Sequence, residues 1–393
     1  MTPLPYGRQL IEEDDIAAVV AALRSDFLAH GPRVGAFEQA FAAAVGAREA
    51  VACSSASTAL LLALQGLDVG PGDLCVVPAV TFLSTATAPL LCGARVAFSD
   101  VDADSGLMTP ASLAAAVAGR SVKAVLPVHL GGRIADMAGV SLVARAAGAA
   151  VVEDAAHAVG GVDGFGAAVG ACAVSDAACY SFHPVKTLAA GEGGMITLND
   201  PARAARMRRL RNHGVAHDPA LLTLAESLEP DGSRKPWVYE QLELGFNYRM
   251  DEMSAALGLS QLGKLGRFSA RRAALSALYD QALGPLAPLV RPAAPGEGRP
   301  TLHLYQVLID FDAAGVRREG VMRRMAAAGI TVQVHYIPLY RQPTFIARHG
   351  EQRLPGAEAF YARALALPLF PAMADGDVQR VVEALGEALG VRP

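Results

Sequence analysis

AAVVEDAAHAV (149–159), ACYSF (178–182) and GMITL (194–198) are the stretches that decide the fold class of this 393-residue chain. Each contains a short apolar run of the kind found in strands that are buried on both faces. Helix-like segments rich in Ala and Leu, such as 57–65 and 137–147, lie between several such runs. Four similar runs come earlier in the chain, at 49–53, 73–79, 94–100 and 123–129. This alternation predicts an α/β fold with a mainly parallel seven-stranded sheet that is covered by helices on both faces.

The pattern changes near Asp251. A long helical segment is predicted to begin there, with Asp251 as its N-cap. A Pro/Gly-rich stretch follows it, and then a strand-like run, a helix, a second strand-like run at 330–337 and a closing helix. We therefore expect a large domain at 1–250 and a smaller α+β domain at 251–393, joined by the long helix. The charged segment at 225–235 contains Pro and Gly and is predicted to be a mobile loop.

Composition and charge exclude several kinds of protein. The chain has 34 basic and 38 acidic residues, and a net charge of −4 argues against nucleic acid as the main partner. One basic run, at 201–214, spreads its arginines around much of a helix, which favours a solvated helix face over a binding patch. The five cysteines include no CxxC pair and no Cys/His cluster with metal-ligand spacing. We expect reduced structural thiols and no metal site.

The sequence also indicates where the protein acts. Its N-terminus lacks the basic-then-apolar order of a signal peptide. The richest apolar segment, at 138–161, is interrupted by Arg145, Glu153 and Asp154, so it does not resemble a membrane span of about 20 apolar residues. We expect a cytoplasmic protein without a membrane partner.

Residues able to do chemistry occur where the predicted strands end. Asp154 closes one strand, and the run that ends near Ser181 leads to Lys186 and then to the GEGG sequence at 191–194. Earlier, SSAS at 54–57 follows a strand and opens a helix. Ligands of parallel sheets bind at the carboxyl ends of the strands. A helix N-terminus made of small residues can approach an anion, although one such end supplies only about 0.3–1 kcal/mol.

A lysine, an acid and an anion cradle at neighbouring strand ends suit one cofactor chemistry. Lysine forms a Schiff base with an aldehyde. An acid such as Asp154 keeps a pyridine nitrogen protonated, so that the ring becomes an electron sink. Taken singly, each feature is better explained structurally: Lys186 as a surface lysine, Asp154 as a helix cap and SSAS as an ordinary N-cap. Their joint occurrence in this order favours a pyridoxal phosphate site.

The chain resembles the DegT-type sugar aminotransferases, which have the fold type I architecture. The resemblance extends from PYGRQ at 5–9 to PLFP at 368–371. Its most specific motifs are EDAAHA (153–158), SFHPVKTLAAGEGG (181–194), RNHG (211–214), GFNYRMDEMSAALGLSQL (245–262) and VHYIPLY (334–340). The HPVKT and VHYIP forms most resemble enzymes that aminate C4 of a UDP-linked 4-keto-6-deoxy sugar in the pseudaminic acid pathway. The resemblance implies pyridoxal 5′-phosphate as cofactor and an amino acid, L-glutamate, as donor.

The resemblance also implies roles for individual residues at the cofactor. Lys186 is the catalytic residue, which carries the cofactor and moves the proton. Asp154 pairs with the pyridine nitrogen, and His157 lies beside the phenolic oxygen of the ring. The remaining cofactor-binding residues are Ser181 and the Ala56 and Ser57 amides at the phosphate, Phe82 on the ring face, and Asn247 from the neighbouring subunit. Many family members have glycine in place of Ala56, but Ser57 still offers a hydroxyl and an N–H.

Further matches concern the substrate and the partner subunit. The expected sugar-nucleotide contacts are Tyr6, Leu28, Ala29, His30, Gly31, His335, Tyr336 and Ile337. Because Asn247 is expected to reach the phosphate of a second copy, the resemblance implies a homodimer with shared active sites. His183 either faces the substrate or fills space, with the structural role favoured. His129 is interpreted as a core histidine, and Arg249 as an ion-pair partner at the subunit contact.

Other functions stay open at this point. A family relative that dehydrates a keto-sugar has histidine in place of the Schiff-base lysine, and this chain keeps Lys186. A cysteine desulfurase needs a cysteine on a mobile loop, whereas these cysteines lie in or beside strands. Another nucleotide keto-sugar (dTDP or GDP, aminated at C3 or C4) and a non-catalytic cofactor-binding regulator are the remaining alternatives.

Overall fold

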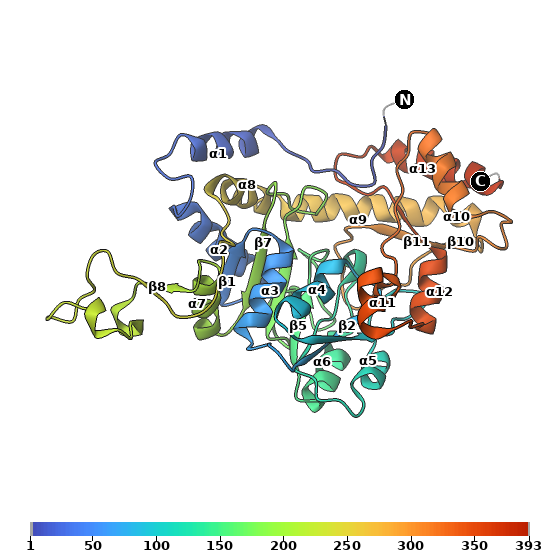
Figure 1. Ribbon diagram of the computed structural model, residues 1–393. Coiled ribbons are helices and arrows are strands. Elements are labelled where there is room, and N and C mark those ends of the chain that lie inside the picture. Colours follow the sequence, from blue (N-terminus) through green and yellow to red (C-terminus); the bar gives the residue numbers. More distant parts are fainter. Residues whose placement is uncertain (1–2, 392–393) are drawn as a thin grey trace.

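The large sheet has seven strands and is mainly parallel. The computed structural model describes residues 3–391, and Figure 1 shows this sheet at the centre of the larger unit. The strand order is β1-β7-β6-β5-β4-β2-β3, and only β7 runs antiparallel to its neighbours. The strand bounds are β1 Glu49–Cys53, β2 Leu74–Pro78, β3 Arg95–Ser99, β4 Ala124–Val125, β5 Ala150–Asp154, β6 Ala177–Ser181 and β7 Gly194–Leu198. The predicted α/β fold class is confirmed.

Helices cover both faces of this sheet because successive strand residues point to opposite sides. In β7, Ile196 packs in the core beneath α3, whereas Met195 packs in the core beneath α2. The helix bounds in this unit are α1 Glu13–Leu23, α2 Pro32–Val45, α3 Ala56–Gly66, α4 Leu83–Leu91, α5 Pro110–Val117, α6 Met137–Ala146 and α7 Pro201–Leu210. Strand β4 is shorter than the predicted run at 123–129, since Pro127 has no N–H to extend the ladder.

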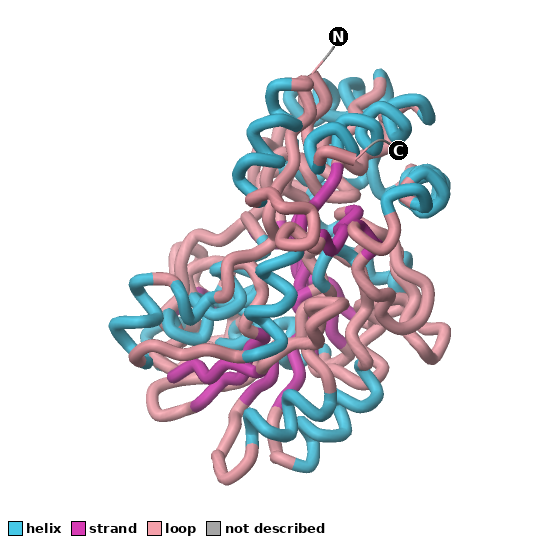
Figure 2. The backbone as a smooth tube through the Cα atoms, turned by 90° about the vertical axis from the view of Figure 1, so that its right-hand side faces the viewer, coloured by secondary structure: helices cyan, strands magenta, loops and turns pink. Residues whose placement is uncertain are grey.

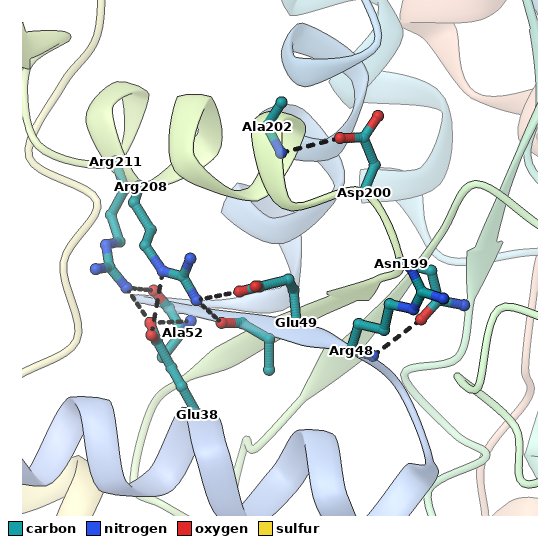
Figure 3. A network of polar contacts seen from close by, with 10 residues as sticks. Glu38, Arg48, Glu49, Ala52, Asn199, Asp200, Ala202, Arg208 and Arg211 are labelled. Carbon is teal, nitrogen blue, oxygen red and sulfur yellow. Dashed lines mark hydrogen bonds and ion pairs between the residues drawn. The ribbon is translucent and has the colours of Figure 1, made fainter. Parts of the chain in front are cut away.

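Charged side chains of α2 and α7 cover the outer edge of β1 (Figure 3). Glu38 accepts a hydrogen bond from the backbone N–H of Ala52 at 2.9 Å. At the end of α7, Arg211 donates to the Ala52 carbonyl at 2.6 Å and pairs with Glu38, and Arg208 pairs with Glu38 at 3.4 Å. An uncovered sheet edge can pair with another chain. These arginines of the basic run at 201–214 therefore close the sheet edge, and the predicted solvated face is wrong for them.

A second unit contains a small antiparallel sheet in the order β10-β11-β12. Figure 2 shows it with its helices above the large sheet. Its core joins α9, α10 and α13 to this sheet through residues such as Tyr279, Met325 and Val382. The bounds are α8 Glu252–Leu262, α9 Leu265–Ala282, β10 Val290–Pro292, β11 Tyr305–Ile309, α10 Arg318–Ala327, α11 Pro343–His349, α12 Pro355–Arg363, β12 Ala364–Leu367 and α13 Asp375–Leu389.

Asp251 is the N-cap of α8, and its carboxylate accepts a hydrogen bond from the backbone N–H of Ser254 at 2.8 Å. The predicted single long helix is instead two helices, α8 and α9, separated by Gly263 and Lys264. The Lys264 side chain turns back to Asp15 at 2.7 Å, and this ion pair ties the break to α1. The division of the chain at 250/251 remains a prediction.

The strand-like run at 330–337 does not form a continuous strand. Ile330 bridges to Leu4 and Gln333 bridges to Ala366, but no ladder connects them. Beyond Gln333 the chain leaves the small sheet and crosses to the large one, where the Leu339 N–H donates to the Ala79 carbonyl at 2.8 Å. This crossing carries His335 and Tyr336 toward the carboxyl ends of the large sheet.

A segment around β8 (Val215–Ala216) and β9 (Glu240–Gln241) projects from the body (Figure 1). It includes the predicted loop at 225–235, whose mobility remains a prediction. Short 3-10 turns occur here at Pro219–Leu221 and Ala225–Ser227, and elsewhere at Leu130–Gly132, Gly284–Leu286 and Leu339–Arg341. Among the described helices, none combines the length and apolarity needed to span a bilayer.

Gly194, the first residue of β7, fixes how closely three strand ends approach. It lies opposite Cys53 of β1 and Ser181 of β6. A Cβ at this position would lie 2.2 Å from the Ser55 carbonyl oxygen. Only glycine therefore lets β7 pass the loop that follows β1.

We expect Gly194→Ala to lower the free energy of unfolding by about 1–3 kcal/mol, because backbone atoms of that loop must shift. Gly266→Ala is the matched control, since no atom lies within 4 Å of the added methyl group in α9. The control should stabilise the helix by up to about 1 kcal/mol. Urea unfolding followed by circular dichroism measures both, and equal effects would contradict the close approach.

Candidate active site

A cavity of about 410 Å³ lies at the carboxyl ends of the large sheet, within the range of about 300–1,000 Å³ usual for small-molecule sites. Its walls come from the turns after β1, β2, β5 and β6 and from the crossing segment at 333–340. Ten of the predicted site residues line it: Tyr6, Ala56, Ser57, Phe82, Asp154, His157, Ser181, Lys186, His335 and Tyr336.

Lys186 lies in the turn that follows β6. Its backbone N–H donates to the His183 carbonyl at 2.8 Å, which closes this turn and directs the side chain into the cavity. Burial disfavours the charged ammonium and lowers the pKa of Lys186 to about 8, although the nearby Asp154 opposes this shift. The amine therefore reaches its nucleophilic, unprotonated form near neutral pH.

Asp154 is a buried carboxylate at the end of β5. The Thr85 hydroxyl donates to Oδ2 at 2.7 Å, and the Ala156 N–H donates to Oδ1 at 3.2 Å. Burial raises the pKa of Asp154, while these hydrogen bonds and Lys186 act in the opposite direction. Within residues 3–391 this carboxylate has no ion-pair partner at 4 Å or closer. A buried carboxylate needs a cation, and a protonated pyridine nitrogen in the cavity meets that need.

The start of α3 forms the anion cradle. Ser55 is its N-cap, and the Ser55 hydroxyl accepts from the Thr58 N–H at 3.3 Å. The N–H groups of Ala56 and Ser57 belong to the first helical turn, where no intrahelical acceptor exists. Ser181 lies opposite them, at the end of β6, and also lines the cavity. These donors fit a phosphate group.

Histidine and aromatic rings form the remaining wall. His157 Nδ1 accepts from the Gly131 N–H at 3.1 Å. Burial, and then Lys186, holds the pKa of His157 well below its usual value, so the neutral ring carries its proton on Nε2. Tyr336 Oη lies 3.4 Å from that nitrogen. The centroids of the Phe82 and Tyr336 rings are 5.8 Å apart. Phe82 is 53% exposed, so its ring can stack on a ligand.

Several predicted residues lie elsewhere. His30 and Gly31 line a separate cavity of about 190 Å³ with Arg211 and Arg249. Neither cavity is lined by Asn247 or by the other predicted residues Leu28, Ala29 and Ile337. The roles assigned to all these residues remain predictions.

The structure places the three polar residues whose roles the sequence left as interpretations. His183 is exposed and lines the cavity, which is the alternative that the sequence reading disfavoured. His129 is fully buried and bonds to Glu153 at 2.9 Å, as a core histidine does. Arg249 donates to the Asn212 side chain at 2.5 Å within its own chain.

Two residues beside the site were not predicted from the sequence. Thr85 holds Asp154, and the buried His303 packs its ring 4.7 Å from the ring of His157. A signal for Thr85 existed, because it lies one helical turn after Phe82 and so shares its side of α4. No local signal marks His303, which lies in the loop just before β11.

A lysine with a lowered pKa, a buried acid without a counter-ion and an anion cradle around one cavity define a site for a phosphorylated pyridine aldehyde. Comparison with known proteins agrees. Residues 9–386 match the DegT/DnrJ/EryC1/StrS aminotransferase family, and the chain belongs to this family.

Individual relatives cover nearly the whole chain. It is 38% identical over 385 residues to the spore coat polysaccharide biosynthesis protein SpsC of Bacillus subtilis, with 97% of this chain and 96% of SpsC covered. The sugar aminotransferase Spr1654 of Streptococcus pneumoniae, solved in its PLP form, is 25% identical with a TM-score of 0.87 and 99% of both chains covered. Helicobacter pylori PseC, an aminotransferase of pseudaminic acid biosynthesis, has a TM-score of 0.90 at 24% identity, with 99% of this chain and 100% of PseC covered.

These findings confirm the predicted family, the aminotransferase fold and the enzyme class. The protein is a pyridoxal phosphate-dependent sugar aminotransferase. The PseC likeness supports the fold alone.

The lowered pKa of Lys186 has a direct consequence for cofactor uptake. A normal lysine titrates near 10.4, whereas a pKa of about 8 leaves roughly one amine in ten unprotonated at pH 7. We expect the rate of imine formation between cofactor-free protein and pyridoxal phosphate to rise with pH and to level off above about 8. Stopped-flow absorbance measures it, and a midpoint near 10 would contradict the burial of the amine.

Removal of the Thr85 hydroxyl should weaken the ionised form of Asp154. We expect Thr85→Val to reduce aminotransfer about 10- to 100-fold, since a hydrogen bond to a charged group is worth about 1.5–3 kcal/mol. The acid limb of the pH–rate profile should also move to higher pH, because activity is lost as Asp154 becomes protonated. Thr87→Val is the control, since Thr87 lies exposed on the same helix. An unchanged acid limb would refute this role.

Proposed function

We propose that the enzyme transfers an amino group from L-glutamate to C4 of a UDP-linked 4-keto-6-deoxy sugar. The observation that carries the proposal is the pairing of Lys186 with the buried, uncompensated Asp154 in one cavity. The sequence motifs HPVKT and VHYIP support the choice of acceptor, which is finer than family membership.

Each residue of the site has a separate role, which follows from its position. When bound, pyridoxal phosphate supplies the electron sink that lets the Cα–H bond of an amino acid ionise. Asp154 holds the positive charge of the pyridine nitrogen, which the hydrophobic surroundings would otherwise disfavour. Lys186, whose pKa burial lowers to about 8, loses its proton more easily than an ordinary lysine; the free amine accepts the proton at the donor carbon and returns a proton at the sugar carbon. The α3 start and Ser181 anchor the phosphate, and this anchoring keeps the reacting carbon in reach of Lys186.

The sugar would lie against the wall made by Tyr6, His335 and Tyr336. The ring centroid of His335 lies 5.7 Å from that of Tyr6 and 4.8 Å from that of Tyr336. Burial lowers the pKa of His335 to about 4, so it faces a ligand as a neutral ring. An apolar wall with a few hydroxyl and imidazole groups fits a 6-deoxy sugar, which presents one methyl face and few hydroxyl groups.

A homodimer with shared active sites belongs to this proposal. The segment that precedes Asn247 exposes large apolar side chains, with Trp237 73%, Leu244 83% and Phe246 65% exposed. Such a patch marks a protein contact. A second copy that covers it would bring Asn247 and the turn at 28–31 near a cavity of its partner. The cytoplasmic location stays a prediction.

The visible absorption spectrum of the purified enzyme tests both half-reactions. We expect a cofactor band that L-glutamate bleaches and that a UDP-4-keto-6-deoxy sugar then restores, because Lys186 serves both proton transfers. Restoration only by a dTDP- or GDP-linked sugar, or by a 3-keto sugar, would overturn the proposed acceptor and leave the aminotransferase intact.

Lys186→Ala and Lys186→Arg are the matched variants for this test. Both should bind the cofactor without covalent attachment and lose at least about 10³-fold in turnover, while circular dichroism stays unchanged. Arginine keeps a cation in place but does not deprotonate. Near-normal turnover in either variant would refute the role of Lys186.

A further inference from the structure

A second and larger cavity, of about 1200 Å³, lies at the opposite edge of the large sheet. The amino ends of β2 and β4 and most of the edge strand β3 form one wall, and residues 348–354, at the end of α11 and beyond it, form the other. The three strands are neighbours in the sheet order. This cavity shares no lining residue with the cofactor cavity.

The walls of this cavity are strongly basic. Arg95, Arg120, Lys123 and Arg348 line it, together with a single carboxylate, Asp73. Among the described residues, none of these four cations lies within 4 Å of a carboxylate, and only Arg348 makes a side-chain hydrogen bond, to a carbonyl of its own helix. Asp73 is engaged by the Gly70 N–H at 2.9 Å.

This cluster differs from the other basic surface of the molecule. The arginines of α7 are bound by acids, as Arg206 is by Asp68 and Glu243. In a chain with a net charge of −4, these four cations have no ion-pair partner among the described residues, and solvent only weakens their mutual repulsion, since Arg95, Arg120 and Arg348 are exposed. An anion that enters the cavity removes this repulsion.

Other polar side chains also line this cavity. One is His349, whose Nε2 is buried and has no hydrogen-bond partner among the described residues. The imidazole is held between Phe98 at 5.8 Å and Phe345 at 6.3 Å, so the ring is fixed in place. Ser121 and Gln352 add a hydroxyl and an amide to the lining.

We propose that this cavity binds a small molecule that carries at least two linked phosphate groups. Guanidinium groups match phosphate oxygens in pairs, and three arginines with one lysine exceed what a single phosphate needs. The cations converge on a concave space rather than forming a stripe along the surface, which fits a small ligand better than a nucleic acid strand. The site is separate from the aminotransferase reaction and does not depend on the proposed acceptor.

Calorimetric titration of the cofactor-loaded enzyme with inorganic pyrophosphate tests the proposal. We expect saturable binding that weakens with added salt, because exposed charges are screened. The combined change Arg95→Gln and Arg348→Gln should raise the Kd for pyrophosphate at least tenfold. Arg323→Gln, which removes one positive charge from the exposed face of α10, should change the Kd less than twofold.

A second variant keeps the test decisive if the double change impairs folding. Arg120→Gln alters a connecting turn and should still weaken pyrophosphate severalfold, while the cofactor absorption band reports an intact enzyme. ATP that binds more tightly than pyrophosphate, and that Arg120→Gln weakens, would identify a nucleotide as the ligand. Equal binding of tripolyphosphate and nucleotides would identify an inorganic polyphosphate. Pyrophosphate binding that no variant affects, or no binding at millimolar concentration, would overturn the proposal.

Discussion

The buried carboxylate of Asp154 is the constraint on which the rest of the site depends. A carboxylate without a counter-ion is costly in a protein interior, and its hydrogen bonds from Thr85 and Ala156 offset only part of that cost. Burial shifts the pKa values of Asp154 and Lys186 in opposite directions, because it favours the neutral acid and the neutral amine. A cationic pyridine ring resolves the conflict, since it supplies the cation that holds the carboxylate ionised and so lets Lys186 give up its proton. The protein without cofactor is thus prepared electrostatically for a ligand that brings one positive charge.

The sheet supplies the geometry that this electrostatic arrangement needs. Gly194 lets antiparallel β7 lie between β1 and β6, so the loop after β1 and Ser181 face each other across one strand. Glu38 and Arg211 form hydrogen bonds with the N–H and the carbonyl of Ala52 at the outer edge of β1. These bonds hold the end of β1, and so the start of α3, in place. Phosphate donors from two distant parts of the sequence are therefore held by strand register rather than by flexible loops.

Much of this arrangement follows from the sequence, because it depends on local patterns. Apolar runs predict the strands, and Asp154, Ser181 and SSAS follow from where the runs end. The break between α8 and α9 was not predicted, since it is fixed by the contact of Lys264 with Asp15, about 250 positions away. His303 was missed for the same reason, because it meets His157 only through the crossing of two units. The carboxyl end of a strand is visible in a sequence, whereas a contact between units is not.

The two edges of the sheet show how one scaffold separates opposite electrostatic tasks. At the carboxyl edge, burial makes charges expensive, and the buried acid Asp154 and the buried amine Lys186 both have pKa values shifted toward their neutral forms. At the amino edge, cations such as Arg95 and Lys123 remain partly solvated, so the same number of strands can hold several like charges at little cost. A reaction that moves protons needs the first environment, and the recognition of a multiply charged anion needs the second.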